Sequence, residues 1–177
     1  MTPLDLLKYP IGKYIKPTEI TENQIQNWIG TIENFPKKLQ LISHNLTDED
    51  LNKTYRPAGW TIKQVVHHCA DSHINAYIRM KLALTELLPV INPYNEAIWA
   101  NLPDGNQDAI SASLLLIEGL HQRWVVFLKN LTIYELRRAY YHPGNNENVA
   151  IETAIGLYAW HCNHHLAYIE MAIANKN

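Results

Sequence analysis

Apolar side chains recur at helical spacing in long segments of this chain, whereas the alternation of apolar and polar residues that marks a β-strand is nearly absent. Thr21 with Gln24, and Thr61 with Gln64, have the spacing of capping boxes and mark the starts of the first two segments. The pattern therefore predicts an all-α fold, a four-helix bundle. The four expected helices cover residues 21–44, 62–87, 109–129 and 151–174.

The expected connection between the second and third helices is long. Residues 89–108 are rich in Pro, Asn and Gly, and only a short amphipathic piece stands out, at about 95–102. Residues 143–148 form a turn-rich break before the fourth helix. Residues 1–20 show no sustained period, so we expect an N-terminal arm there that packs on the domain or lies along a partner subunit. Residues 21–177 are predicted to form a single domain.

A short motif occurs twice with the same spacing. Asn-Leu-Thr, followed at fixed distances by Leu and Tyr, begins at residue 45 and again at residue 130. Each copy follows an odd-numbered helix and precedes an even-numbered one, which is typical of an internal duplication. A chance match is the alternative, because these are ordinary turn residues. A duplication would make the second and fourth helices face each other, with His68 corresponding roughly to His161.

Composition and charge exclude several classes of protein. With 47% hydrophobic and 18% charged residues, the 177-residue chain is too apolar to be disordered. The net charge of -2, with no basic cluster, gives no reason to expect a nucleic-acid partner. No apolar run approaches the ~20 residues of a membrane span, and the first residues do not form a signal peptide, so we expect a cytoplasmic protein without a membrane partner. Two cysteines fit a reducing compartment.

Histidine is the unusual entry in the composition, with nine residues. Residues four apart project from the same face of a helix, so His161 and His165 can both reach one ion. Neutral imidazole is a common zinc ligand, and three protein ligands plus water are typical of a catalytic zinc site. A third ligand has to come from another helix, and His68 is the best candidate because small and apolar residues share its face. Six histidines lie on the second and fourth expected helices: His67, His68, His73, His161, His164 and His165.

Other histidines leave alternatives open. His67 points about 100° away from His68, so we interpret it as a residue that supports a ligand or faces solvent. His164 competes with His165, because it lies three residues from His161. A lone pair of histidines four apart is more often hydrogen-bonded or exposed than bound to metal. The three single histidines are interpreted as structural: His44, His121 and His142.

Competing metal signatures fail on particular residues. A zincin has Glu after the first histidine of its helical pair, and this chain has Cys162 there. Di-iron bundles need two Glu-x-x-His pairs, and only Glu118 with His121 is present. Cys69 and Cys162 each follow a candidate ligand and lie on a different helix face, so we predict buried apolar roles for both.

Several motifs together resemble a known family. Residues 60–68 read W-T-I-K-Q-V-V-H-H, residues 70–73 read A-D-S-H, and residues 160–165 read W-H-x-x-H-H. Further matches are Y-P-I-G-x-Y at 9–14, P-Y-N-E at 93–96, R-W at 123–124 and Y-H-P at 141–143. On these motifs, which span nearly the whole chain, the protein resembles the DinB-like superfamily and, within it, the YfiT type of metal-dependent hydrolases.

The resemblance implies a four-helix bundle with a metal held by one histidine of the second helix and a pair from the fourth. Carried over by position, the ligands are His68, His161 and His165. It also implies a homodimer. The reaction stays open, because relatives include enzymes that transfer low-molecular-weight thiols such as bacillithiol or mycothiol.

Three functions are therefore compatible with the sequence. In a hydrolase of a small-molecule substrate, one divalent ion, zinc with nickel or manganese as alternatives, lowers the pKa of water. Asp71, one turn from His68, is the only carboxylate near the site by spacing, and it serves as base or orients an imidazole. A thiol S-transferase needs the metal but no protein base. In a non-enzymatic binding or oligomerisation module, the histidines would be core or interface residues.

Overall fold

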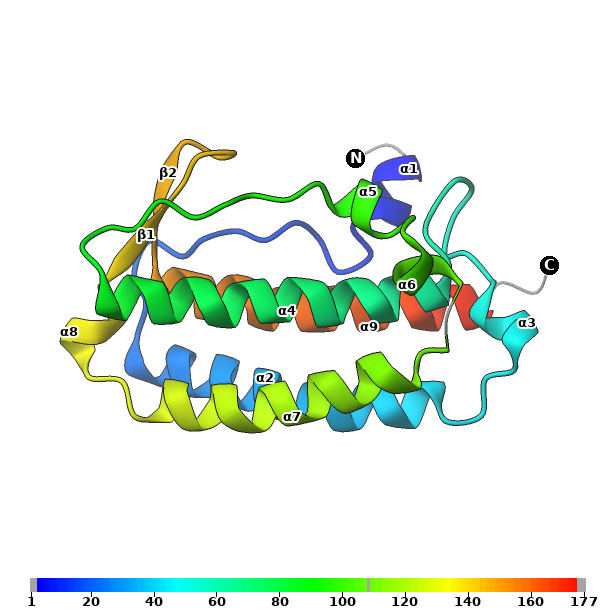
Figure 1. Ribbon diagram of the computed structural model, residues 1–177, viewed down its shortest axis with the longest axis horizontal. Helices are drawn as coiled ribbons and strands as arrows, with labels where there is room; N and C mark the ends of the chain where they lie inside the picture. The colour runs from blue at the N-terminus through cyan, green and yellow to red at the C-terminus, as the bar shows by residue number, and fades with distance from the viewer. Residues whose placement is uncertain (1–2, 108, 175–177) are drawn as a thin grey trace.

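A computed structural model describes residues 3–107 and 109–174 of the protein. Its long helices agree closely with the expected ones, and the predicted four-helix bundle is confirmed (Figure 1). The long helices are α2 (Glu22–Ser43), α4 (Ile62–Thr85), α7 (Ser111–Lys129) and α9 (Ile151–Ala174). The short elements are α1 (Pro3–Lys8), α3 (Asp48–Leu51), α5 (Glu96–Trp99), α6 (Pro103–Asn106), α8 (Ile133–Leu136), β1 (Ala139–His142) and β2 (Glu147–Ala150).

Both predicted capping boxes form. The Gln24 amide donates to Thr21 Oγ1 at 3.3 Å, and the Gln24 side chain accepts from the Thr21 amide at 3.0 Å. Thr61 and Gln64 make the same pair of bonds at 3.2 and 3.1 Å. Because these bonds satisfy amides that have no partner within the helix, they set where α2 and α4 begin.

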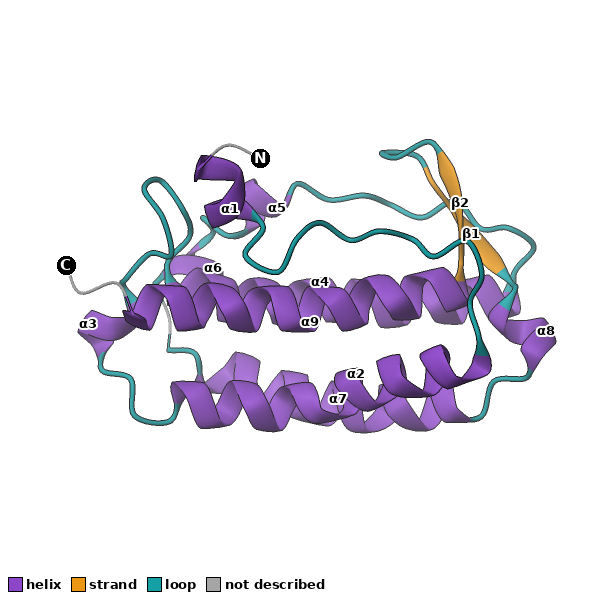
Figure 2. Ribbon diagram, turned by 180° about the vertical axis from the view of Figure 1, so that it is seen from behind, coloured by secondary structure: helices purple, strands orange, loops and turns teal. Residues whose placement is uncertain are grey.

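The long helices pack as two layers. Contacts join α2 to α7 and α9, and α4 to the same two helices, so α2 lies diagonally opposite α4, and α7 diagonally opposite α9. In Figure 1, α4 and α9 form the upper layer and α2 and α7 the lower one, and Figure 2 shows the same layers from behind. The expectation that the second and fourth helices lie against each other is therefore confirmed.

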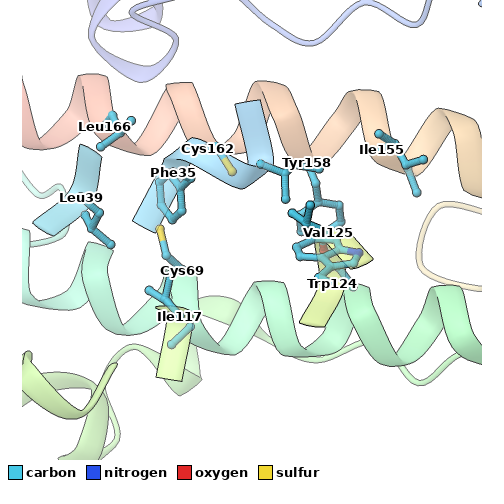
Figure 3. Packing of buried hydrophobic residues seen from close by; sticks show 14 of the residues in the cluster. Phe35, Leu39, Cys69, Ile117, Trp124, Val125, Ile155, Tyr158, Cys162 and Leu166 are labelled. Atoms are coloured by element: carbon cyan, nitrogen blue, oxygen red, sulfur yellow. The ribbon is translucent and has the colours of Figure 1, made fainter. Parts of the chain in front are cut away.

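The core fills the space between these layers (Figure 3). Phe35 from α2 and Trp124 from α7 are fully buried there, and each such side chain stabilises the fold by about 1.5–3 kcal/mol. Cys69 and Cys162 are also fully buried among apolar neighbours, and burial raises the pKa of both thiols. Their predicted role as buried apolar residues is confirmed.

The repeated motif forms the same structure twice. Thr47 caps α3 with Asp50, and Thr132 caps α8 with Glu135, each through a capping box. Each motif therefore supplies a capped turn between two long helices.

The backbone after each capped turn is also equivalent. The Ile62 amide donates to the Lys53 carbonyl at 3.0 Å, and the Ile151 amide donates to the Arg138 carbonyl at 2.9 Å. Both long helices thus start from the same hydrogen bond, which supports the duplication. The expected match of His68 with His161 needs correction. When Ile62 is aligned with Ile151, Ser72 is the residue equivalent to His161, and His68 lies one turn before it.

The N-terminal arm and the chain after α4 both run over the α4–α9 layer (Figures 1 and 2). The arm begins with the short helix α1, where an irregular segment was expected. Trp160 Nε1 donates to the Gly12 carbonyl at 3.0 Å, and the Tyr14 hydroxyl donates to the Thr153 carbonyl at 3.3 Å. Gly12 has a φ of 77°, which an L side chain rarely adopts, and this turn aims its carbonyl at Trp160. The arm therefore packs on its own domain, the first of the two arrangements considered.

A small antiparallel hairpin, β1 with β2, was not predicted. Ala139 pairs with Ala150 and His142 with Glu147, and the turn-rich break predicted at 143–148 supplies the turn at 143–146 and the first two residues of β2. Strands of four residues are too short to show a clear alternation. The Tyr141 amide donates to the Pro89 carbonyl at 2.9 Å, which fixes the hairpin to the chain after α4. Within residues 3–107 and 109–174, no helix combines the length and apolar character needed to cross a membrane.

Candidate metal centre

Three imidazole rings converge between α4 and α9. His161 Nε2 lies 3.2 Å from His68 Nε2 and 3.1 Å from His165 Nε2. One nitrogen of each ring lies within 4.8 Å of the other two. His68 and His165 are buried, whereas His161 is half-buried and borders a cavity. The structure thus brings together the three residues that the sequence singled out.

The spacing of these nitrogens suits one transition-metal ion. In a tetrahedral zinc site with Zn–N bonds of ~2.0–2.1 Å, two ligand nitrogens lie about 3.3 Å apart. The two shorter separations here are close to that value. The three residues would fill three of the four positions around an ion and leave the fourth open for water or substrate.

A chain of imidazoles leads from this cluster into the core. His161 Nδ1 lies 3.0 Å from His73 Nε2, and His73 Nδ1 lies 2.8 Å from His121 Nε2. At its inner end, His121 Nδ1 lies 2.7 Å from the Ile32 carbonyl oxygen. A carbonyl oxygen can only accept, so His121 must donate to it. Each neutral imidazole has one donor and one acceptor nitrogen, so this first bond determines the direction of the other two.

This direction fixes the tautomer of His161. His121 donates from Nδ1 and accepts at Nε2, so His73 also donates from Nδ1, and so does His161. The proton-free nitrogen of His161 is therefore Nε2, the atom that faces His68 and His165. Burial keeps these rings neutral, since it lowers the pKa of His121 to about 4 and that of His73 well below its usual range.

A metal ion resolves a conflict that the cluster otherwise contains. Burial lowers the pKa of His68 to about 4 and the pKa values of His161 and His165 well below normal, so all three are neutral at pH 7. His161 Nε2 has one lone pair and accepts a hydrogen bond from only one of its two neighbours. A cation between the rings pairs with all three lone pairs at once, so the donor set fits a divalent ion.

The neighbouring histidines have other partners. His67 Nδ1 lies 2.8 Å from Ser113 Oγ and joins α4 to α7. His164 stacks on Trp160, with ring centroids 4.4 Å apart, and lies outside the three-histidine cluster. His121 was interpreted as a lone structural histidine, and His73 had no assigned role. No sequence signal could have joined them, because their contact depends on how α4 packs against α7.

Two cavities meet at the cluster. The large cavity has about 920 Å³ and includes Ser72, Arg79, Tyr94 and His161 in its wall. The small cavity has about 550 Å³ and is bordered by all three clustered histidines. Because His161 borders both cavities, a substrate in the large cavity has access to the ion that the cluster would hold.

Glu96 is the carboxylate at this junction. It opens helix α5 and borders both cavities together with His161. Burial raises its pKa, and the positive charge of Arg79 opposes that shift. Asp71, which the sequence favoured, borders neither cavity, and burial with repulsion from Asp104 raises its pKa to about 6. Helical spacing could not have indicated Glu96, because it cannot show where the long connection returns, and the role expected of Asp71 stays a prediction.

Comparisons with known proteins agree with this fold and site. The model of a family described as the DinB superfamily matches residues 31–169. "Putative metal-dependent hydrolase YfiT" of Bacillus subtilis is 46% identical over 163 residues, which are 92% of each protein. A relative from Halalkalibacterium halodurans with the same description is 47% identical over 166 residues, 94% of this chain and 96% of its own.

A solved structure is also similar. The YfiT structure from Bacillus subtilis superposes with a TM-score of 0.89 at 45% identity, covering 93% of this chain and 94% of that one. It is described as "a probable metal-dependent hydrolase with an unusual four-helix bundle topology". On the family match, the close relatives and the shared fold, this chain belongs to the DinB superfamily.

Proposed function

We propose that this protein is a metal-dependent hydrolase of small molecules, with a divalent ion held by His68, His161 and His165. The convergence of one nitrogen from each of three neutral imidazoles at the junction of two cavities carries the proposal. A divalent ion bound there supplies Lewis acidity that lowers the pKa of water from ~15.7 towards ~7. The descriptions of the relatives as metal-dependent hydrolases support the same reaction class.

Glu96 serves as the general base in this proposal. Its carboxylate is placed at both cavities, and a carboxyl group with a raised pKa accepts a proton more readily than an ordinary one. Glu96 takes the proton of the attacking water and returns it to the leaving group. Nearby, Tyr158 donates to the Ser72 carbonyl at 3.3 Å, and its hydroxyl stays protonated because burial raises its pKa.

The deeper histidines orient the site. His73 accepts from His161 Nδ1 and is itself held by His121, so the imidazole of His161 cannot turn its proton-free nitrogen away from the ion. Partners of this kind around a ligand are commonly worth ~10–100-fold in metal affinity or activity. Zinc is the proposed ion, because neutral imidazoles with open positions are typical of catalytic zinc, and nickel and manganese are the alternatives.

Thiol transfer is the less favoured reaction. The argument for it from the sequence was that a thiol S-transferase needs no protein base. That argument loses its force because Glu96 provides a carboxylate at both cavities. A hydrolase therefore explains one more feature of the site than a thiol S-transferase does. A purely structural bundle explains neither the converging nitrogens nor their access to two cavities.

The test is hydrolysis of a panel of esters and amides by zinc-loaded protein. Activity should disappear with a chelator and return with zinc, nickel or manganese. Glu96→Gln should lower kcat by ~10²–10⁴-fold with unchanged metal content, as expected for loss of a general base. Thiol-dependent consumption of an electrophilic dye with bacillithiol, glutathione or coenzyme A, with no hydrolysis across the panel, would instead support the transferase.

The homodimer and the division into an arm (1–20) and one domain (21–177) stay predictions. Sedimentation velocity of the full chain tests the first. Limited proteolysis tests the second, since cleavage should fall in the arm before any cut within the bundle.

A further inference from the structure

Arg79 is a buried cation in the wall of the large cavity. Only 9% of its surface is exposed, and it lies on α4 beyond the histidine cluster. Its Nη2 donates to the Asn92 carbonyl at 3.2 Å, and its guanidinium carbon lies 5.9 Å from the centre of the Tyr94 ring. Within the described part of the chain, the ion pairs are Lys53 with Asp50 and Lys129 with Glu33, so Arg79 has no carboxylate partner there.

A buried guanidinium without an acid is costly. It carries a full charge and five N–H donors, and arginine is almost never fully buried unless it is paired. Arg79 uses one donor on a backbone carbonyl, and the residue lines the large cavity. Among the described residues, no ion pair neutralises the buried charge of Arg79, although Arg79 and Glu96 interact electrostatically.

The other charged groups of the cavity form no ion pair with Arg79. Lys16 adds a second positive charge, and neither Glu96 nor Glu147 is paired with Arg79, although the charge of Arg79 opposes the rise in the pKa of Glu96. Tyr94 and Tyr140 make the wall near Arg79 largely aromatic. An aromatic wall lowers the local dielectric, so the attraction between Arg79 and an incoming anion is stronger than at the surface.

The distance from Arg79 to the metal centre suits a small molecule. Arg79 lies two helical turns after Ser72, about 10 Å along α4. Ser72 Oγ lies 3.5 Å from His161 Nε2, the nitrogen that faces His68 and His165. Long side chains on a helix lean towards its N-terminus, so the guanidinium is drawn towards Ser72 and the gap becomes shorter.

We propose that the large cavity binds a small anionic substrate whose carboxylate or phosphate pairs with Arg79, while its hydrolysable bond lies beside His161. A guanidinium presents parallel N–H groups that match either oxyanion in a two-point contact. The placement of the hydrolysable bond beside His161 rests on the proposed hydrolase function, whereas the binding of the anion by Arg79 does not. Neutral molecules of the same length lack the contact and bind more weakly.

The first experiment measures binding alone. Succinate, inorganic phosphate and neutral dimethyl succinate are titrated into zinc-loaded protein while the Arg79 side-chain signals are followed by ¹⁵N NMR. The anions should shift these signals and the neutral diester should not. A response to succinate alone identifies a carboxylate site, and a response to phosphate alone identifies a phosphate site. Unshifted Arg79 signals with both anions would overturn the proposal.

Variants give the matched control. Arg79→Gln should weaken anion binding by ~10–100-fold, the value of a hydrogen-bonded charge contact. Arg137→Gln removes the same charge from an exposed position outside the cavity and should leave binding within about 2-fold. Arg79→Lys keeps the charge without the two-point geometry and should fall between them. If Arg79→Gln does not fold, the NMR titration of the unchanged protein decides.

Kinetics separate this inference from the proposed function. The substrates are a matched pair, 4-nitrophenyl hydrogen glutarate and its neutral methyl ester. Arg79→Gln should lower kcat/KM for the anionic ester by ~10–100-fold and leave the neutral ester nearly unchanged. Equal loss on both esters would contradict the anion site while the hydrolase stands. Anion binding at Arg79 without turnover of either ester would contradict the hydrolase while the anion site stands.

Discussion

His161 Nδ1 lies 3.0 Å from His73 Nε2, and through this hydrogen bond a residue of the candidate metal centre is held by the core of the bundle. His73 is fully buried and is fixed in turn by His121 on α7. The candidate metal centre is therefore supported by three helices, although its proposed ligands come from only two.

Replacing His73 should weaken metal binding without touching a ligand. His73→Phe fills similar space but removes the acceptor for the His161 Nδ1 proton, so His161 can adopt the wrong tautomer. We expect zinc affinity to fall by ~10–100-fold, measured by competition with a chromophoric chelator. The ¹⁵N shifts of His161 should at the same time show a mixture of tautomers. Unchanged affinity together with an unchanged tautomer would show that the chain has no orienting role.

His121 offers a rescue experiment at the inner end of the chain. In His121→Gln, the amide can donate to the Ile32 carbonyl and accept from His73, whereas His121→Leu can do neither. The leucine variant should bind zinc more weakly than the glutamine variant, because only the latter keeps the direction of the chain. Equal zinc affinities in the two variants would mean that shape, not hydrogen bonding, matters at this position.

The three proposed ligands should differ sharply from their neighbours. His68→Ala, His161→Ala and His165→Ala should each remove most zinc affinity, since two histidines lose both a bond and the geometry. His164→Ala should retain binding, because that ring stacks on Trp160 outside the cluster. Metal content per chain after dialysis is the measurement. Loss of metal in the His164 variant with retention in the His165 variant would reverse the assignment.

Acid should destabilise the metal-free protein in a defined pH window. The pKa values of His68 and His121 are lowered by burial to about 4, against an ordinary value near 6.5. Between these values the unfolded chain binds protons that the folded chain does not, so the free energy of unfolding falls as the pH drops from ~6.5 to ~4. Each group contributes up to about 3 kcal/mol to this loss. Urea unfolding at a series of pH values measures it, and His121→Gln should flatten the curve.

Two helical glycines should respond in opposite directions to alanine. A Cβ at Gly156 would lie 2.9 Å from the Trp28 ring and from the Tyr14 hydroxyl, so Gly156→Ala should destabilise the fold by about 1–3 kcal/mol. A Cβ at Gly119 meets nothing within 4 Å, so Gly119→Ala should stabilise α7 by about 0.5–1 kcal/mol. Urea unfolding of both variants is the check, and a gain in stability at Gly156 would show that the arm yields easily.

The long helices could be predicted because their signals are local. Thr21 and Thr61 begin α2 and α4 through bonds to residues three positions away, and the apolar stripe is visible in the sequence. The hairpin could not be predicted in this way, because Tyr141 is held by Pro89, which is distant in the chain.

The candidate site, too, could be predicted only where its signals are local. His161 and His165 share a helix face, so spacing alone pairs them. The carboxylate at the junction, Glu96, and the cation of the large cavity, Arg79, depend on where the chain after α4 returns across the bundle. Local patterns carry no record of that path, which is why the spacing pointed to Asp71 instead.

The two equivalent turns of the duplicated chain have unequal lengths. Between α3 and α4, a single bridge joins Thr54 to Thr61, whereas the equivalent place before α9 carries the whole β1–β2 hairpin. Both turns nevertheless lead into a long helix, and the first residue of that helix, Ile62 or Ile151, donates the equivalent backbone hydrogen bond. The hairpin also borders the large cavity. A scaffold of this kind can vary the hairpin beside its cavity and keep the three-histidine cluster, so related proteins can differ in what their cavities accept while the cluster is retained.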